Sequence, residues 1–188
     1  MWDLRLGIDT GGTMPTAVAD AYQYSTISYP ATFAILDHLG LEARDVFVDV
    51  GCGKGRVLCC AGLGGVRESC GIEVDESLCA AAEQNARQLR RAHAPITVEN
   101  LSAQDFNFDK GTVFYLFNPF GADTLRTVLG HLEASWRAQP RPVRIAYVNP
   151  KHEAAFHEAG WIERYDQWQP RRRILLDHAV SFWRPLSR

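Results

Sequence analysis

Three glycines follow a short apolar run within residues 46–56, VFVDVGCGKGR, and this part of the sequence is the best suited to bind a ligand. The run at 46–50 has the apolar, β-branched composition of a strand buried on both faces of a parallel sheet. Gly51, Gly53 and Gly55 lack the Cβ atoms that would keep a ligand away from the backbone. Free N–H groups at the start of the next helix attract a carboxylate or phosphate. The segment therefore predicts a strand, a tight loop and a helix that bind a charged cofactor.

An acidic side chain follows at the end of the next apolar segment. Residues 69–75, SCGIEVD, predict a second strand with Glu73 at its carboxyl end. A carboxylate in this place can accept hydrogen bonds from both hydroxyls of a ribose. A nicotinamide or flavin fingerprint requires Gly or Ala at the sixth position of G-x-G-x-x-G, where this chain has Arg56. A nicotinamide-dependent oxidoreductase is therefore the weaker alternative, and no G-x-x-x-x-G-K-[ST] phosphate loop occurs.

These segments resemble a known family. The string DVGCGKGR, followed by GIEVD and ESLCAAAEQNARQL, is similar to motifs I and II of the class I S-adenosylmethionine-dependent methyltransferases. Residues 113–120, VFYLFNPF, occupy the place of the family's D/N-P-P-Y/F motif. The resemblance implies an α/β fold: a Rossmann-like, doubly wound, mostly parallel seven-stranded sheet with a terminal antiparallel hairpin and a short N-terminal lid. It implies a methyltransferase domain over residues 24–188, preceded by an arm over residues 1–23.

The resemblance also implies which residues hold the cofactor. The glycine loop would surround the methionine end of S-adenosylmethionine, and Glu73 would hold the ribose. Ser102 and Ala103 stand where the family has Asp-Ala beside the adenine. The implied cofactor-binding residues are Tyr24, Thr26, Asp49, Gly51, Cys52, Gly53, Gly55, Glu73, Ser102, Ala103 and Asn118.

The strand-four motif implies the catalytic residues. In amino-methylating members of the family, the Asn side chain and the Pro carbonyl accept hydrogen bonds from the target nitrogen, and an aromatic ring packs on it. The matching residues are Asn118, Pro119 and Phe120, which favours an amine or amide nitrogen of a small molecule or protein as the acceptor. The competing interpretation is that Asn118 only caps the helix expected from residue 121.

The N-terminal part predicts an arm and a covering segment. Residues 6–13, LGIDTGGT, resemble the phosphate loop of actin-like sugar kinases, but Pro15 follows and no second strand is evident, so an arm with glycine turns is expected. Related methyltransferases often place the segment before the first helix across the cofactor. Tyr24, Thr26 and Tyr29 are therefore candidates for the lid, although Tyr29 is equally suited to pack on the core.

The rest of the chain alternates strands and helices, which predicts parallel strands with right-handed crossovers. Ser28, Pro30 and Gly40 indicate the two ends of an early helix, and residues 101–110 are too few for a crossover helix. Segments 161–168 and 173–183 predict the final hairpin. The other expected strands are 46–50, 70–74, 95–99, 111–117 and 143–148, and the other expected helices are 55–64, 76–92, 121–137 and 151–159.

Composition and charge indicate where the protein is expected to occur and which partners it is not expected to attract. The chain has 188 residues, 46% of them hydrophobic, which is typical of one domain with a full core. A net charge of −2 predicts no general attraction to nucleic acid or membrane, and the cluster Arg171-Arg172-Arg173 is interpreted as a solvated turn. Five cysteines without a C-x-x-C pair predict reduced buried thiols, and no segment has the length of a membrane span. We therefore expect a cytoplasmic protein.

Two further points concern catalysis. The sequence has no cluster of Asp and Asn residues that would predict a metal site. Among the candidate bases, His152 is the best placed because it follows the fifth strand. Besides the methyltransferase, a non-catalytic S-adenosylmethionine-binding partner protein is consistent with the glycine loop. The intact Asn118-Pro119 favours the enzyme. The sequence leaves the oligomeric state open.

Overall fold

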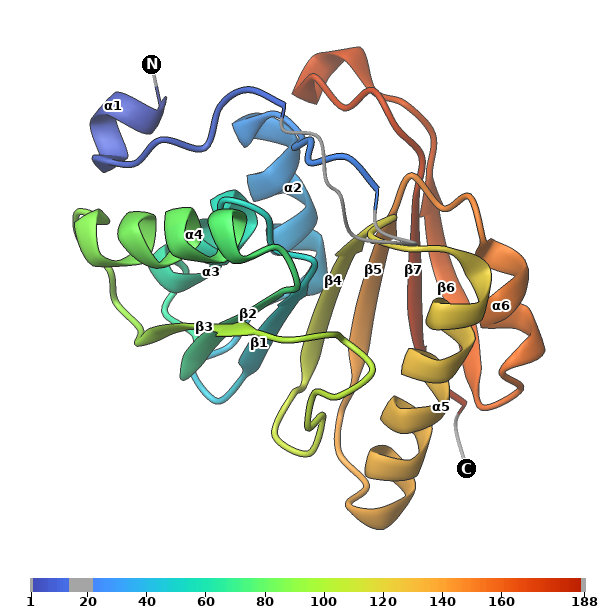
Figure 1. Ribbon diagram of the computed structural model, residues 1–188. Coiled ribbons are helices and arrows are strands. Elements are labelled where there is room, and N and C mark those ends of the chain that lie inside the picture. Colours follow the sequence, from blue (N-terminus) through green and yellow to red (C-terminus); the bar gives the residue numbers. More distant parts are fainter. Residues whose placement is uncertain (1, 14–21, 187–188) are drawn as a thin grey trace.

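In the computed structural model, which describes residues 2–13 and 22–186, the strands form one seven-stranded sheet in the order β3-β2-β1-β4-β5-β7-β6 (Figure 1). Strands β1 to β5 pair in parallel, and β7 is antiparallel to both β5 and β6. The predicted doubly wound sheet with a terminal hairpin is confirmed. The strands are β1 (Val46–Val50), β2 (Glu68–Glu73), β3 (Ile96–Asn100), β4 (Val113–Phe117), β5 (Arg144–Val148), β6 (Ile162–Trp168) and β7 (Val180–Pro185).

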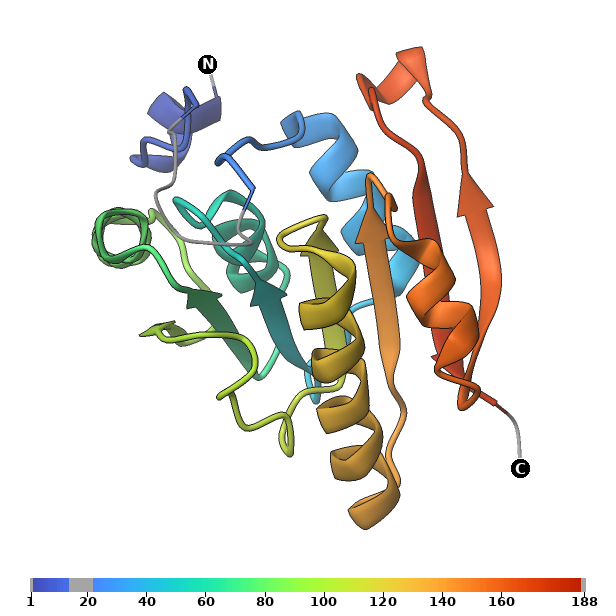
Figure 2. The same cartoon turned by 45° about the vertical axis from the view of Figure 1, so that its right-hand side comes forward.

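Helices cover both faces of this sheet (Figure 2). One face carries α2 (Tyr29–Leu39), α3 (Arg56–Leu63) and α4 (Glu76–Gln88), and the other carries α5 (Ala122–Ala138) and α6 (Glu153–Glu158). Side chains of β1 alternate between two apolar cores, as the period of a strand requires. Val48 packs toward α5, while Phe47 packs toward α2.

The predicted helix signals act as expected. Ser28 precedes α2 and its hydroxyl accepts the Ala31 N–H at 3.2 Å, while Gly40 ends the helix with a φ of 61°. Asp75 begins α4 by accepting from the N–H groups of the second and third helical residues. Residues 101–112 between β3 and β4 contain no helix, so this part of the sheet is covered by a loop.

Three segments differ from the sequence expectation. Helix α4 ends at Gln88 rather than near residue 92, because Leu89 leaves the helical conformation with a ψ of 120°. The second strand of the hairpin begins at Val180 rather than near residue 173, because Arg171 and Leu176 exchange backbone hydrogen bonds of 2.9 and 3.2 Å that close a turn. This turn contains the 3₁₀ helix η1 (Arg172–Ile174). The arm begins with a short helix, α1 (Trp2–Leu6), which the sequence did not indicate. Within the described ranges, no helix is long and apolar enough to cross a membrane.

Candidate functional site

The glycine loop turns sharply at the carboxyl end of β1. Gly51, Gly53 and Gly55 have φ angles of 75°, 54° and 79°, in the left-handed region that side chains rarely adopt. The N–H groups of Gly51 and Cys52 both donate to the Ile72 carbonyl of β2 at 2.9 Å. The loop is thus tied to the neighbouring strand and presents little more than backbone.

Two of these glycines meet other segments at very short range. A Cβ atom on Gly51 would lie 2.6 Å from the Cβ of Pro119, which follows β4. A Cβ atom on Gly53 would lie 2.3 Å from two ring carbons of Tyr24. Both positions therefore require glycine, and the loop lies between the strand-four motif and the segment that precedes α2.

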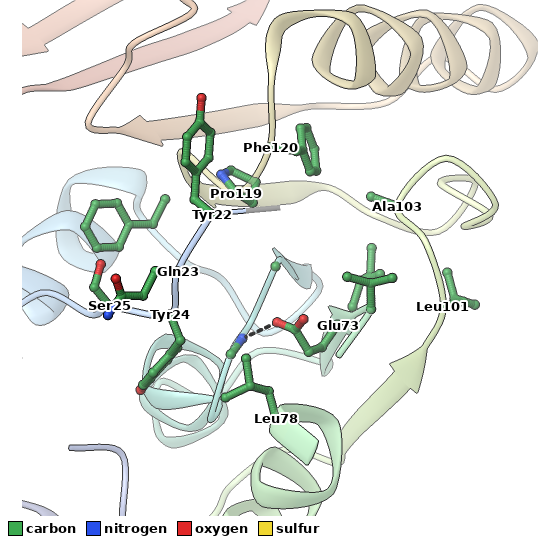
Figure 3. A pocket seen from close by; sticks show the side chains of 15 residues that line it. Tyr22, Gln23, Tyr24, Ser25, Glu73, Leu78, Leu101, Ala103, Pro119 and Phe120 are labelled. Atoms are coloured by element: carbon green, nitrogen blue, oxygen red, sulfur yellow. Dashed lines mark hydrogen bonds between the residues drawn. The ribbon is translucent and has the colours of Figure 1, made fainter. Parts of the chain in front are cut away.

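Glu73 reaches from the end of β2 toward the loop. Its Oε2 accepts the Gly53 N–H at 2.8 Å (Figure 3). Its Oε1 accepts the Asp75 N–H at 3.0 Å. Burial raises the pKa of this carboxyl above its ordinary value, although hydrogen bonds from the backbone amides of Asp75, Gly53 and Val74 favour the charged form. A carboxylate offers about four lone-pair positions, so Glu73 can still accept from a ligand.

Asp49 lies beneath the loop. It is buried within β1, and its Oδ2 accepts the N–H of Leu58, the third residue of α3, at 3.1 Å. Burial raises its pKa to about 8, against the opposing effect of the Leu58 hydrogen bond. Asp49 therefore joins β1 to the start of α3 and holds together the two elements that the loop connects.

A cleft of about 670 Å³, including the part open to solvent, lies between the loop and the end of β4 (Figure 3). The expected site residues that line it are Tyr24, Gly51, Gly53, Glu73, Ala103, Pro119 and Phe120. Those that lie outside its lining are Thr26, Asp49, Cys52, Gly55, Ser102 and Asn118.

The cleft also contains residues that sequence reasoning missed. Val74, Leu78 and Leu101 line it with apolar side chains. Position in the sequence could have indicated two of them, because Val74 directly follows Glu73 and Leu101 precedes Ser102 and Ala103.

The strand-four motif is held by two contacts. Asn118 is buried, with a φ of 39°, and its Oδ1 accepts the Tyr147 hydroxyl at 3.0 Å. The Pro119 carbonyl accepts the Tyr22 N–H at 3.2 Å. Helix α5 begins after Gly121 without a side-chain cap. The interpretation of Asn118 as the cap of that helix is therefore wrong.

The segment before α2 crosses the cleft. Tyr22 and Tyr24 line it, and the Tyr22 hydroxyl lies 3.0 Å from Nε2 of His152. Tyr29 instead packs among the core residues between α2 and the sheet. Of the three candidates for the lid, Tyr24 lines the cleft, whereas Thr26 and Tyr29 do not.

The arm is attached beside the glycine loop. Arg56 donates to the hydroxyl of Thr10 at 2.8 Å and to its carbonyl at 3.2 Å. Asn85 of α4 accepts the Asp9 N–H at 2.8 Å and donates to the Asp9 carbonyl at 2.9 Å. Residues 14–21, which connect this part to Tyr22, lie outside the described residues.

The described residues have no disulfide and no candidate metal site. All five cysteines are free and buried, as expected, and burial raises the pKa of the Cys52 thiol. In residues 2–13 and 22–186, no group of three or more His, Cys, Asp or Glu side chains could hold a metal ion.

Comparison with known proteins identifies the family. Residues 17–111, just over half of the chain, match the family model described as histone methylation protein DOT1. The chain belongs to the DOT1 family of methyltransferases. A sequence search of curated proteins finds no match.

Solved structures of other methyltransferases share this fold. An RNA methyltransferase from Salinibacter ruber in complex with S-adenosyl-L-homocysteine has 19% identity and a TM-score of 0.65, covering 87% of this chain and 95% of that one. The ribosomal protein L11 methylase from Lactobacillus delbrueckii subsp. bulgaricus has 14% identity and a TM-score of 0.63, covering 83% and 77%. A methyltransferase from Thiobacillus denitrificans, also with S-adenosyl-L-homocysteine, has 16% identity and a TM-score of 0.57, covering 76% and 67%.

The methyltransferase therefore uses S-adenosylmethionine, as the resemblance implied. Its own residues fit this cofactor, because Glu73 has free lone pairs beside an exposed Gly51 backbone and an apolar wall. The nicotinamide alternative is not supported by these comparisons.

Proposed function

We propose that this methyltransferase binds S-adenosylmethionine between the glycine loop and Glu73 and transfers its methyl group to an amine or amide nitrogen. The observation that carries the proposal is the close approach of Gly51 to Pro119, where an added Cβ would stand 2.6 Å away. Because of this approach, a cofactor on the loop has its reactive end beside the strand-four motif. Ligands of open α/β sheets bind at such carboxyl strand ends.

In the cofactor half of the site, Glu73 accepts the two ribose hydroxyls. The adenine lies against the apolar wall of Val74, Leu101 and Ala103, and the methionine end lies over the exposed backbone of Gly51. The arrangement is supported by the lining of the cleft. The expected residues outside the lining, such as Asp49 and Gly55, act by shaping the loop.

In the acceptor half, Asn118 and the Pro119 carbonyl accept hydrogen bonds from the target nitrogen, and Phe120 is an apolar wall. Tyr147 holds the Asn118 amide in place through its hydroxyl. The nitrogen lone pair attacks the methyl carbon, the bond from that carbon to sulfur breaks, and S-adenosylhomocysteine leaves. The methylated nitrogen then loses its proton to solvent water. The Pro119 carbonyl already accepts from Tyr22, and its second lone pair is available to the substrate.

The test is methyl transfer from labelled S-adenosylmethionine across a panel of amines, amides, peptides and oligonucleotides. Transfer that depends on Asn118 supports the proposal, whereas cofactor binding without transfer to any member supports the non-catalytic binding protein. We also propose a cytoplasmic location, which the five free cysteines support.

A further inference from the structure

The turn between β6 and β7 carries the densest positive charge of the sequence, and it lies at the active-site edge of the sheet. Strand β6 ends at Trp168, which pairs with Val180 at the start of β7. Val180 also pairs with Val148, the last residue of β5. The connecting residues 169–179, which we call the basic tip, therefore project beyond the carboxyl ends of the parallel strands (Figures 1 and 2).

The basic tip is fixed beside the cleft. The Ser28 hydroxyl, at the start of α2, lies 3.1 Å and 3.0 Å from the carbonyls of Ile174 and Leu175. The ring centroid of His178 lies 5.2 Å from that of Phe117, which lines the cleft. These contacts attach the basic tip to the start of α2 and to the end of β4. The charges of the basic tip therefore have a defined position relative to the cleft.

The charges of the tip are available for a ligand. Arg171, Arg172 and Arg173 are exposed, and none forms an ion pair with a carboxylate of the described residues. Asp177 is the one carboxylate of the tip. On the same side of the cleft, Nζ of Lys151 lies 5.3 Å from the Tyr22 ring.

This local distribution differs from what the net charge of −2 predicts. The arginines of the tip and Lys151 lie on the β5–β7 side of the cleft, while Glu73 and Asp75 lie on the β2 side. A cationic flank repels a protonated amine such as a lysine side chain. It attracts an anionic molecule whose acceptor nitrogen is itself neutral.

We propose that the basic tip binds the phosphate backbone of a single-stranded nucleic acid and presents a base to the strand-four motif. The inference rests on the proposed function. Guanidinium groups match phosphate oxygens in a two-pronged geometry, and the exocyclic amine of a base is neutral at pH 7. Tyr22, which is 44% exposed and lines the cleft, supplies an aromatic face on which a base stacks. An acidic peptide would use the arginines but not this ring.

The test is fluorescence anisotropy with a labelled single-stranded RNA of mixed sequence, measured over a series of salt concentrations. We expect the variant Arg171→Gln/Arg172→Gln/Arg173→Gln to bind at least tenfold more weakly than the wild type and with a smaller salt dependence. Because Arg171 lies over the Trp168 ring at 4.3 Å, the double variant Arg172→Gln/Arg173→Gln is measured as well and should show most of the loss. A control with the same charge change carries Arg44→Gln, Arg87→Gln and Arg137→Gln, all in surface ion pairs, and should bind as the wild type does.

Titration with S-adenosylhomocysteine separates this inference from the proposed function. All variants should bind it with wild-type affinity, because none of the changed residues lines the cleft. Loss of RNA binding in the control and tip variants alike would overturn the inference, as would a wild type that does not bind RNA. Equal, arginine-dependent binding of a polyglutamate peptide would overturn the assignment to nucleic acid. Absence of S-adenosylhomocysteine binding in the wild type would instead refute the proposed function.

Discussion

The ring of Tyr24 lies against Gly53 at the position that a Cβ atom would occupy, with two ring carbons 2.3 Å from that point. The Tyr24 hydroxyl donates to the Thr10 carbonyl at 2.7 Å. One aromatic side chain thus joins the glycine loop, the segment before α2 and the arm. A change at Gly53 is therefore expected to move all three.

The first prediction concerns this contact. Gly53→Ala should lower the free energy of unfolding by at least about 1–2 kcal/mol, the cost of a left-handed backbone for a residue with a Cβ. Displacement of Tyr24 should also weaken S-adenosylhomocysteine binding. Urea unfolding and calorimetric titration measure the two effects. The control is Gly130→Ala in α5, where an added Cβ meets nothing within 4 Å, and it should stabilise the protein by about 0.5–1 kcal/mol. Equal behaviour of the two variants would refute the assigned contact.

The second prediction concerns the acceptor. Asn118→Ala should leave cofactor affinity within a few-fold and reduce turnover by roughly a hundredfold or more, because a positioning contact is lost. Tyr147→Phe removes the hydrogen bond that holds the Asn118 amide, so it should lower turnover less, with a loss of stability of about 1 kcal/mol. The measurement is the turnover of each variant with an acceptor found in the panel of amines, amides, peptides and oligonucleotides. Wild-type turnover in Asn118→Ala would exclude Asn118 from the site.

Much of the fold was predictable because its signals are local. The cap residues Ser28 and Asp75, and the turn glycine Gly40, act through neighbours in the sequence, and the apolar runs define the buried strands. The start of the final strand was not predictable, because the turn at Leu175 depends on pairing between Arg171 and Leu176 and on the contact with Ser28. Such contacts between distant segments leave no periodic pattern.

The site residues that were predictable from the sequence are those whose own chemistry indicates a role. Glu73 and the glycines follow from their own chemistry, and the structure places Glu73, Gly51 and Gly53 in one cleft, with Gly55 outside its lining. The role of Tyr147 was not predictable, since its hydroxyl reaches Asn118 only after β4 and β5 pair. The arm's attachment through Arg56 and Asn85 likewise depends on helices that are distant from residues 9–10 in the sequence.

The third prediction concerns pH. Burial raises the pKa of Asp49 from its ordinary value of 3.8 to about 8, so the folded state favours the protonated form. The associated stability is complete below about pH 4 and is lost as the pH rises toward 8, by up to about 1.4 kcal/mol per pH unit. Asp49→Asn should flatten this dependence, because the amide oxygen still accepts from Leu58 but does not ionise. Urea unfolding from pH 5 to 8 measures the slope, and identical slopes in both proteins would contradict the assignment.

The fourth prediction concerns the arm. Deletion of residues 1–20 removes Thr10 and the hydrogen bonds that Arg56 donates to it. We propose that the arm acts as a lid, so the deletion should change the KM for the acceptor more than it changes the melting temperature. The matched full-length variant Arg56→Gln, which loses the same contacts in part, should shift KM in the same direction. A truncated protein with unaltered kinetics would show that the arm is outside the site.

The central claim is that the cleft beside Glu73 holds the cofactor, and calorimetric titration with S-adenosylhomocysteine tests it most directly. The wild type should bind, and Glu73→Ala should weaken binding by about 1.5–3 kcal/mol, the scale for hydrogen bonds to a charged group, or roughly ten- to a hundredfold. The control Glu83→Ala, whose carboxylate pairs with Arg87 on the surface of α4, should retain wild-type affinity. Wild-type affinity in a folded Glu73→Ala protein, or no binding by the wild type, would contradict the account.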